Sequence, residues 1–185
     1  MTLSFDSARL TNPNLTPDHE AWREQMRRFV DREIMPFAAG WDEAGGLPDK
    51  LWRKASEVGM LGLGYPEKYG GLTDGIDIWH HNILNEELAR PGVGGLAATL
   101  MVQSIGLPPV VNFASDAVRQ SVVPQILDGS KCIALGITEP GGGSDVANIT
   151  TTARREGDEW VINGEKFYIS GAGDKRCKIM ITMVK

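Results

Sequence analysis

The stretch Thr138–Asp145, with the sequence TEPGGGSD, constrains this chain more than any other, because the spacing of apolar residues changes beside it. Upstream, apolar residues recur every three or four positions, as in amphipathic helices, whereas downstream they alternate with polar residues, as in half-buried strands. The apolar run Cys132–Ile137, directly before the stretch, has the length of a buried strand. The sequence therefore predicts a loop that leaves the end of a strand, where a helical region gives way to a β region.

The composition of this loop indicates a ligand site. Pro140 ends the hydrogen bonding of the strand, and we expect Gly141–Gly143 to adopt backbone conformations closed to other residues and to approach a ligand closely. Thr138, Ser144 and free backbone N–H groups then serve as hydrogen-bond donors. The alternative is an ordinary Gly-rich hairpin turn, which three consecutive glycines by themselves would favour.

General phosphate-binding motifs do not fit the loop. The dinucleotide motif GxGxxG and the P-loop ending GK[ST] both require a helix to begin at the glycines. Here Gly143 is followed by Ser144 and Asp145, and then by the β-branched run Ile149–Thr152, which favours a strand. The sequence therefore excludes both of these nucleotide sites.

The periodicity predicts an α+β chain, with an all-α domain over residues 1–130 and an antiparallel β-domain over residues 131–185. Thr16 followed by Pro17 predicts the start of the first helix, and Gly129 predicts the end of the last. The arginines of the first helix are interleaved with acids, so we expect them on a solvated face. Helices are expected over residues 17–37, 51–58, 76–88, 93–103 and 115–127, and strands over residues 132–137, 149–154, 160–162, 167–169 and 178–184, with Asn163–Gly164 as a hairpin turn.

Charge and composition exclude several classes of partner. The formal net charge of −5 and the pI near 5.2 argue against nucleic acid or an anionic membrane as the main partner, and no run of the sequence suggests a membrane span. Cys132 and Cys177 lack metal-ligand spacing, and the first residues lack a leader pattern, so we expect free thiols in a cytoplasmic protein. His80 and His81 are expected to be partly exposed helical histidines without a bound metal.

Two linked motifs resemble those of the acyl-CoA dehydrogenase family. Thr138–Asp145 is similar to the flavin loop of that family, TEPGxGSD, and Gly157–Ser170 (GDEWVINGEKFYIS) is similar to a second family motif that follows in the same order. Shorter similarities lie in Val58–Gly71 and in Glu86–Arg90 (EELAR). Together these segments extend the resemblance over nearly the whole chain.

The resemblance implies an FAD-dependent oxidoreductase of fatty acid metabolism that desaturates an acyl-CoA thioester. A carboxylate would take the Cα proton while the Cβ hydride passes to flavin N5. In this family the base lies in a later helical domain, so no catalytic residue is assigned, and we expect the β-domain to be incomplete at Lys185. The resemblance also implies an electron-transfer flavoprotein as acceptor and a homo-oligomer, specifically a homotetramer, as the assembled form.

The resemblance also implies which residues contact the cofactor. Tyr168 would lie against the flavin ring, the Ser170 hydroxyl near flavin N5, and Ser144 near FAD or the CoA part of the substrate. The chain has Leu135, Tyr168 and Ser170 where the family commonly has an aromatic residue, Trp and Thr, so flavin potential and substrate preference are expected to differ. The expected cofactor-binding residues are Leu135, Gly136, Ile137, Thr138, Glu139, Pro140, Gly141, Gly142, Gly143, Ser144, Tyr168, Ile169 and Ser170, and Ser144 is also expected to bind substrate.

Two other functions fit the same residues. A flavin oxidase or monooxygenase would use the same fold with oxygen as acceptor, because fold alone does not fix the reaction. A non-catalytic folding or interaction fragment would use none of this chemistry. Oxygen consumption with substrate distinguishes the first, and the presence or absence of bound yellow flavin distinguishes the second.

Overall fold

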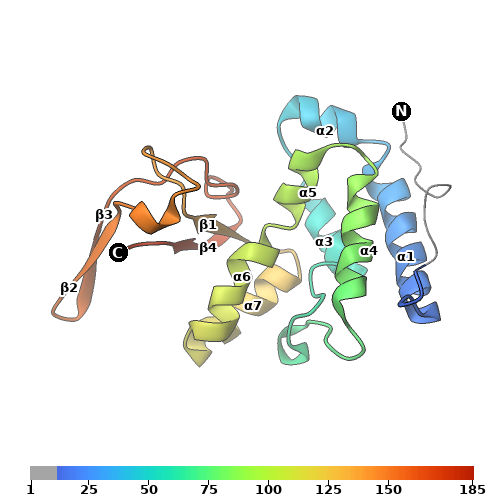
Figure 1. Ribbon diagram of the computed structural model, residues 1–185, viewed down its shortest axis with the longest axis horizontal. Coiled ribbons are helices and arrows are strands. Elements are labelled where there is room, and N and C mark those ends of the chain that lie inside the picture. Colours follow the sequence, from blue (N-terminus) through green and yellow to red (C-terminus); the bar gives the residue numbers. More distant parts are fainter. Residues whose placement is uncertain (1–11) are drawn as a thin grey trace. The chain divides into compact units, whose positions relative to one another are not determined.

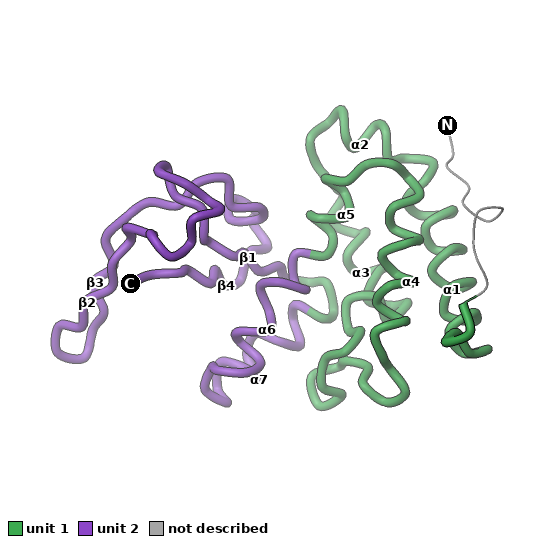
Figure 2. Tube along the Cα trace, in the orientation of Figure 1, with its two compact units in different colours: residues 1–101, 127–130 green, residues 102–126, 131–185 purple. Residues whose placement is uncertain are grey.

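The computed structural model describes residues 12–185, which divide into two compact units (Figure 2). Unit 1 contains residues up to 101 together with 127–130, and unit 2 contains residues 102–126 together with 131–185. Helices precede strands along the chain (Figure 1), so the predicted α+β class is confirmed. The domain boundary at residue 130 stays a prediction. The division into compact units places residues 102–126, which hold most of the last two helices, in the same unit as the strands.

Unit 1 begins with helix α1, Pro17–Phe29, whose N-cap is Thr16 as predicted. The helix does not continue regularly to residue 37. Val30–Ile34 form a π-helical segment in which the Met35 N–H donates to the Val30 carbonyl at 2.8 Å, and α2 then runs over Ala38–Ala44. The predicted single helix is therefore two helices joined by a π turn, an irregularity that apolar spacing does not reveal because the inward stripe continues through it.

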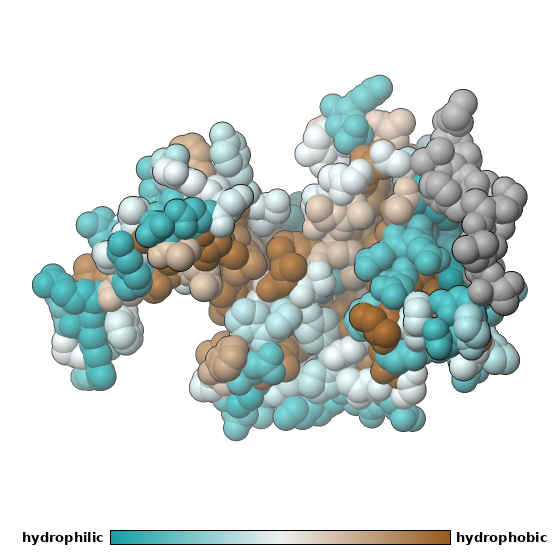
Figure 3. Space-filling model, viewed as in Figure 1, coloured by the Kyte–Doolittle hydropathy of each residue, from teal (hydrophilic) through white to brown (hydrophobic). Residues whose placement is uncertain are grey.

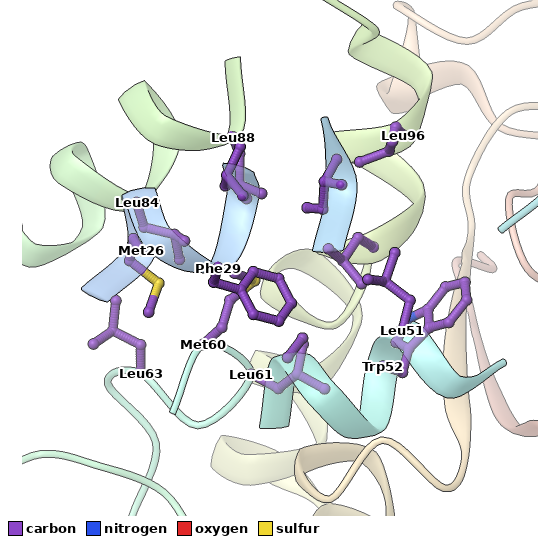
Figure 4. Packing of buried hydrophobic residues seen from close by; sticks show 14 of the residues in the cluster. Met26, Phe29, Leu51, Trp52, Met60, Leu61, Leu63, Leu84, Leu88 and Leu96 are labelled. Carbon is purple, nitrogen blue, oxygen red and sulfur yellow. The ribbon is translucent and has the colours of Figure 1, made fainter. Parts of the chain in front are cut away.

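The remaining elements of unit 1 enclose one apolar core. Met26 and Phe29 of α1 meet side chains from the other elements, which point toward one another in Figure 4. Each such side chain contributes about 1.5–3 kcal/mol through burial. The elements are α3 (Lys50–Glu57), a 3₁₀ turn (Glu67–Tyr69), α4 (Ile78–Ala89) and α5 (Gly94–Leu100).

A buried ion cluster joins α1 to α4. The Glu87 side chain is only 1% exposed, and its carboxylate accepts two hydrogen bonds from Arg27, at 3.1 and 2.9 Å, and one from Arg90 at 3.3 Å. Arg23 is also buried, with Nη1 3.6 Å from Glu87. The expectation that these arginines lie on a solvated face is wrong for Arg23, because carboxylates of α4, from Glu86 and Glu87, supply charge partners.

The N-termini of α1 and α4 are held together by two histidines and Asp77. The N–H of Thr16 donates to His19 Nδ1 at 2.9 Å, which leaves His19 Nε2 to donate to Asp77 Oδ1 at 2.9 Å. His80 Nδ1 lies 2.9 Å from the same oxygen, and both histidines are buried, so the expectation of a partly exposed His80 is wrong. Burial raises the pKa of Asp77, but hydrogen bonds from His80 and His19 outweigh it and hold that pKa well below its usual range.

These three side chains are close enough to share a metal ion, since their candidate ligand atoms all lie within 4.8 Å of one another. Their hydrogen bonds argue for a different role. His19 Nδ1 already accepts a backbone N–H, so its Nε2 carries the proton that a metal would have to replace. Two helix N-termini also add positive potential at Asp77. The cluster is best described as a set of hydrogen bonds that joins the N-termini of α1 and α4, and the absence of a metal stays a prediction.

Unit 2 contains helix α6 (Gln103–Phe113) and nearly all of α7 (Asp116–Leu127), followed by the strands. Strand β1, Cys132–Gly136, pairs with β4, Cys177–Thr182, in parallel, whereas β2, Thr152–Glu156, pairs with β3, Glu159–Asn163, in antiparallel fashion. The prediction of an entirely antiparallel β-domain is therefore wrong for β1 and β4. Sequence periodicity identifies strands but not their partners, and forty residues lie between these two strands.

Two further β predictions are wrong. The β2–β3 hairpin turns at Gly157, whose φ of 63° favours glycine, and not at Asn163–Gly164. Residues 167–169 form no strand, because the Phe167 N–H bonds to the loop carbonyl of Thr138 instead of to a ladder. Apolar side chains of the hairpin, including Trp160, reach the surface, and Figure 3 shows apolar patches among the polar residues of the viewed face.

One described segment, Gly94–Phe113, is long and apolar enough to cross a membrane by length and composition alone. This differs from the expectation that no run approaches a membrane span. The segment is broken into α5 and α6, and 39% of its most apolar window is buried.

A close backbone crossing explains Gly71 of unit 1. A Cβ placed on Gly71 would lie 2.0 Å from the Tyr65 carbonyl oxygen. We expect Gly71→Ala to lower the free energy of unfolding by about 1–3 kcal/mol, because the two backbone segments must separate. Gly46→Ala is the matched control, since a Cβ there meets nothing within 4 Å. Urea titration of both variants measures the difference, and equal stabilities would contradict the crossing as a constraint.

Candidate functional site

The loop after β1 closes in a tight turn. The N–H groups of Glu139 and Gly142 each donate to the other's carbonyl, at 2.9 and 3.0 Å, with Pro140 and Gly141 between them. None of Gly141–Gly143 has a positive φ, so the expectation that these glycines adopt conformations closed to other residues is wrong. Their use is steric instead. A Cβ on Gly143 would lie 3.1 Å from Thr138 Oγ1, while Gly141 and Gly142 present open backbone.

Glu139 anchors the loop to the strand that follows it. Its side chain is buried, and its two carboxylate oxygens accept hydrogen bonds from the backbone N–H and the hydroxyl of both Thr150 and Thr151, at 2.5–2.9 Å. Such an acceptor has no capacity left for a ligand. The Glu139 side chain therefore holds the loop in shape, and a contact of Glu139 with the cofactor stays a prediction.

Lys166 joins the second motif to the same anchor. Its Nζ donates to Glu139 Oε1 at 2.8 Å and to the Ile137 carbonyl at 3.0 Å, and the Phe167 N–H donates to the Thr138 carbonyl at 2.9 Å. The hydrogen bond from Lys166, followed by those from Thr150 and Thr151, holds the pKa of Glu139 well below its usual range. The two motifs identified in the sequence are thus brought together by direct contacts.

The lowered pKa of Glu139 makes a testable contribution to acid stability. A carboxyl with a lower pKa in the folded than in the unfolded state stabilises the fold above its unfolded pKa, near about 4.3, and this stabilisation is lost as the pH falls. We expect Glu139→Gln to be less stable than wild type at pH 7, but to lose less stability between about pH 5 and pH 3. Urea unfolding of both proteins across this range measures the free energy of unfolding at each pH. Parallel plots of that free energy against pH would refute a contribution from Glu139.

The other predicted residues divide into structural and exposed groups. Gly136 is buried, its carbonyl accepts the Met183 N–H at 2.9 Å, and Ile137 gives its carbonyl to Lys166. Leu135 and Ile169 are half-buried, whereas Pro140, Ser144 and Ser170 are exposed. The exposed backbone of residues 141–144, with the half-buried Thr138 hydroxyl at its base, therefore forms the accessible part of the loop.

Tyr168 has an unusual backbone. It is the one non-glycine residue with a positive φ, 56°, in the described part of the chain, and its side chain is 90% exposed. Its ring meets Phe167 edge to face at a centroid distance of 5.6 Å. A strained conformation that holds a large aromatic ring in solvent is a feature of ligand-binding segments. The position agrees with the expectation that Tyr168 offers a ring face, and Ser170 follows two residues later.

These residues fit a flavin. Exposed N–H groups at Gly143 and Ser144 have no acceptor among residues 12–185, and the Thr138 hydroxyl lies beside them. Such donors suit the polar edge of a flavin ring, and an exposed aromatic ring suits its face. Lys166, Thr150 and Thr151 were missed as site residues. Lys166 could have been found from its place within the second motif. Nothing in the sequence marked the two threonines as site residues, because their β-branched side chains indicate only a strand.

The comparisons with known proteins agree with this arrangement. Residues 16–130 match the family profile of the acyl-CoA dehydrogenase N-terminal domain, and residues 134–185 match that of the middle domain. The chain is 36% identical to the long-chain specific acyl-CoA dehydrogenase of Sus scrofa mitochondria, over 83% of this chain and 35% of that protein. It is 35% identical to the glutaryl-CoA dehydrogenase of Desulfococcus multivorans, over 86% of this chain and 41% of that protein.

Solved structures give the same result. A probable acyl-CoA dehydrogenase from Mycobacterium abscessus superposes with a TM-score of 0.82 at 40% identity, over 92% of this chain and 44% of that one. A glutaryl-CoA dehydrogenase from Mycobacterium smegmatis, in complex with FADH2, superposes with a TM-score of 0.77 at 30% identity, over 89% of this chain and 41% of that one. The chain spans less than half the length of these relatives.

Proposed function

The chain belongs to the acyl-CoA dehydrogenase family, and from that premise we propose that it supplies part of the FAD site of an enzyme that desaturates acyl-CoA thioesters. The observation that carries the proposal is the direct junction of the two motifs. Lys166 of the second motif binds Glu139 of the loop, and Phe167 binds Thr138. This junction places the exposed loop backbone and Tyr168 on connected segments.

In the proposed site, the accessible groups of the two motifs contact the flavin and the substrate. The Thr138 hydroxyl and the N–H groups of Gly143 and Ser144 donate hydrogen bonds to the polar edge of the flavin, where negative charge grows during reduction. The Tyr168 ring covers a face of the flavin, and Ser170 donates near N5. Ser144, at the exposed end of the loop, also contacts the CoA part of the substrate.

Bound flavin supplies the hydride acceptor for oxidation at Cβ. The chain's own residues orient that acceptor and stabilise the charge that develops on it, and Lys166 and Glu139 keep those donors fixed. The carboxylate that takes the Cα proton is assigned to no residue of this sequence. An electron-transfer flavoprotein is the proposed acceptor, in keeping with a structural neighbour described as an electron transferring flavoprotein, and a homotetramer is the proposed assembly.

Anaerobic reduction tests the proposal. The FAD-loaded protein that carries this chain is mixed with a panel of straight, branched and dicarboxylic acyl-CoA thioesters, and we expect at least one to bleach the flavin absorbance. Failure of every thioester to bleach bound FAD would overturn the dehydrogenase. Rapid oxygen consumption with the reducing thioester would instead identify an oxidase.

Two hydroxyl groups of the site have a separate test. We expect Thr138→Ala and Ser170→Ala each to weaken FAD retention or slow flavin reduction by about tenfold, because each removes one donor to the flavin. The thermal midpoint of the apoprotein should stay nearly unchanged, since Thr138 is only half-buried and Ser170 is exposed. Fluorescence of released flavin and stopped-flow absorbance measure the effects. A large loss of apoprotein stability would assign both residues to folding alone.

A further inference from the structure

A second candidate site lies in unit 1, beside the π segment Val30–Ile34. It is a cavity of about 330 Å³, near the lower limit of volumes found for small-molecule sites. Its lining includes an aromatic pair, three basic side chains and one acid. These are Phe37, Trp41, Arg32, Lys50, Lys54 and Glu33.

The aromatic pair forms a stacked wall. Phe37 and Trp41 lie one helical turn apart, with ring centroids separated by 5.5 Å and ring planes inclined by 26°. Phe37 is 49% exposed, whereas Phe29, Trp52 and Tyr69 of this unit are buried. An exposed ring pair of this geometry offers a flat apolar surface on which another planar ring can stack.

The charges of the cavity favour an anion. Glu33 accepts hydrogen bonds from Lys54 and, at 2.8 Å, from Arg32, and its pKa is held below its usual range, first by the hydrogen bond from Lys54. Lys50 has no ion-pair partner among the described residues. The lining therefore carries an excess of positive charge on a chain whose net charge is −5. By contrast, the 590 Å³ cavity along α1 is lined by Asp18 and Glu57 and by no Lys or Arg of the described chain.

The π segment explains how these groups converge. The wider turn between Val30 and Met35 lets Glu33 fold inward, where its side chain is 14% exposed, while neighbouring Arg32 stays largely in solvent. Glu33 also pairs with Lys54 of α3, and both side chains line the cavity. Single π turns inside helices cost stability and are found frequently at functional sites.

We propose that this cavity binds a purine nucleoside monophosphate, with the base stacked on Phe37 and Trp41 and the phosphate bound by Lys50 and Lys54. A flat ring and a compact anion on one small molecule match the two halves of the lining, and the volume suits one nucleotide better than a dinucleotide such as FAD. Free nucleotide and the adenosine phosphate end of CoA share this chemistry. The site does not depend on the flavin proposal, because all its residues lie in unit 1.

Equilibrium dialysis of the full chain with labelled AMP tests the site. We expect saturable binding of one AMP per chain, competition by CoA or unlabelled AMP, and much weaker competition by adenosine or ribose 5-phosphate, each of which has half of the recognised chemistry. Stronger competition by CoA than by AMP would identify CoA as the source of the ligand. No saturable binding, or equal competition by adenosine and AMP, would overturn the proposal.

Variants locate the binding. Trp41→Leu and Lys50→Met should each weaken AMP binding by about tenfold. Lys68→Met is the matched control, because Lys68 also lies over an aromatic ring, 4.9 Å from the Tyr69 centroid, but outside the cavity. Phe37→Leu, at a half-exposed position, repeats the aromatic test if circular dichroism shows that Trp41→Leu is unfolded. Binding that survives all three cavity variants, or that Thr138→Ala abolishes, would show that AMP binds elsewhere.

Discussion

Replacing Glu87 by Ala is expected to lower the free energy of unfolding by about 3–5 kcal/mol, because it removes the buried carboxylate that Arg23, Arg27 and Arg90 share. Arg23 keeps its ion pairs with Glu20 and Glu86. Arg27 loses its bidentate acceptor, and Arg23, 4% exposed, loses the carboxylate that lies 3.6 Å away. Helices α1 and α4 would then be held by apolar packing, by the Arg23–Glu86 ion pair and by the hydrogen bond between His19 and Asp77. Urea unfolding followed by circular dichroism measures the change.

An exposed ion pair within α1 provides the control. Glu24 and Arg28 pair at 3.2 Å with side chains that are 75% and 70% exposed, so Glu24→Ala should change stability by less than about 1 kcal/mol. Glu87→Gln, which keeps the shape and the acceptor oxygen, should fall between the two variants. If Glu87→Ala were as mild as Glu24→Ala, the cluster would have no special part in joining α1 to α4.

Replacing Lys166 by Met is expected to release the loop from the second motif. The substitution removes the hydrogen bonds to Glu139 and to the Ile137 carbonyl and leaves a buried carboxylate without its counter-ion. We expect the thermal midpoint to fall by about 5 °C or more and the amide of Phe167 to exchange faster with solvent. In the FAD-loaded protein, flavin retention should fall as well.

Lys178→Met in β4 is the comparison for Lys166, since Lys178 is an exposed lysine of the same unit. Calorimetry and hydrogen exchange of both variants separate the loss of the junction from the loss of a positive charge. Unchanged protection of residues 138–144 in Lys166→Met would mean that Thr150 and Thr151 hold the loop without help from the second motif.

Local signals in the sequence predicted some helical boundaries but missed α6, Gln103–Phe113, which contains Pro108 and Pro109. Thr16 and Pro17 start α1, and Gly45 ends α2 with a φ of 69°, because caps and turns depend on the residues within one turn of them. The π segment between these helices escaped prediction. An extra residue in one turn preserves the apolar stripe, so the pattern that identifies a helix is insensitive to it.

Features that depend on distant partners could not be predicted in the same way. Glu139 was expected to face a cofactor, but its partners Thr150, Thr151 and Lys166 come from two later segments. His80 was expected to be partly exposed, but α1 brings His19 against it at a ring distance of 4.4 Å. The two motifs singled out in the sequence do meet in the structure. Which of their side chains face inward was decided by contacts across the fold.

The parallel pairing of β1 with β4 has a consequence for the order of folding. Cys132 pairs with Cys177, 45 positions later, so this ladder closes only after a long chain segment has been brought back on itself. Helix α1 and the β2–β3 hairpin form through much nearer contacts and are expected to form sooner. The loop Thr138–Asp145 starts two residues after β1 and meets Lys166, which precedes β4, so it takes its final shape late. During synthesis, cofactor capture would therefore follow, and not guide, closure of the strands.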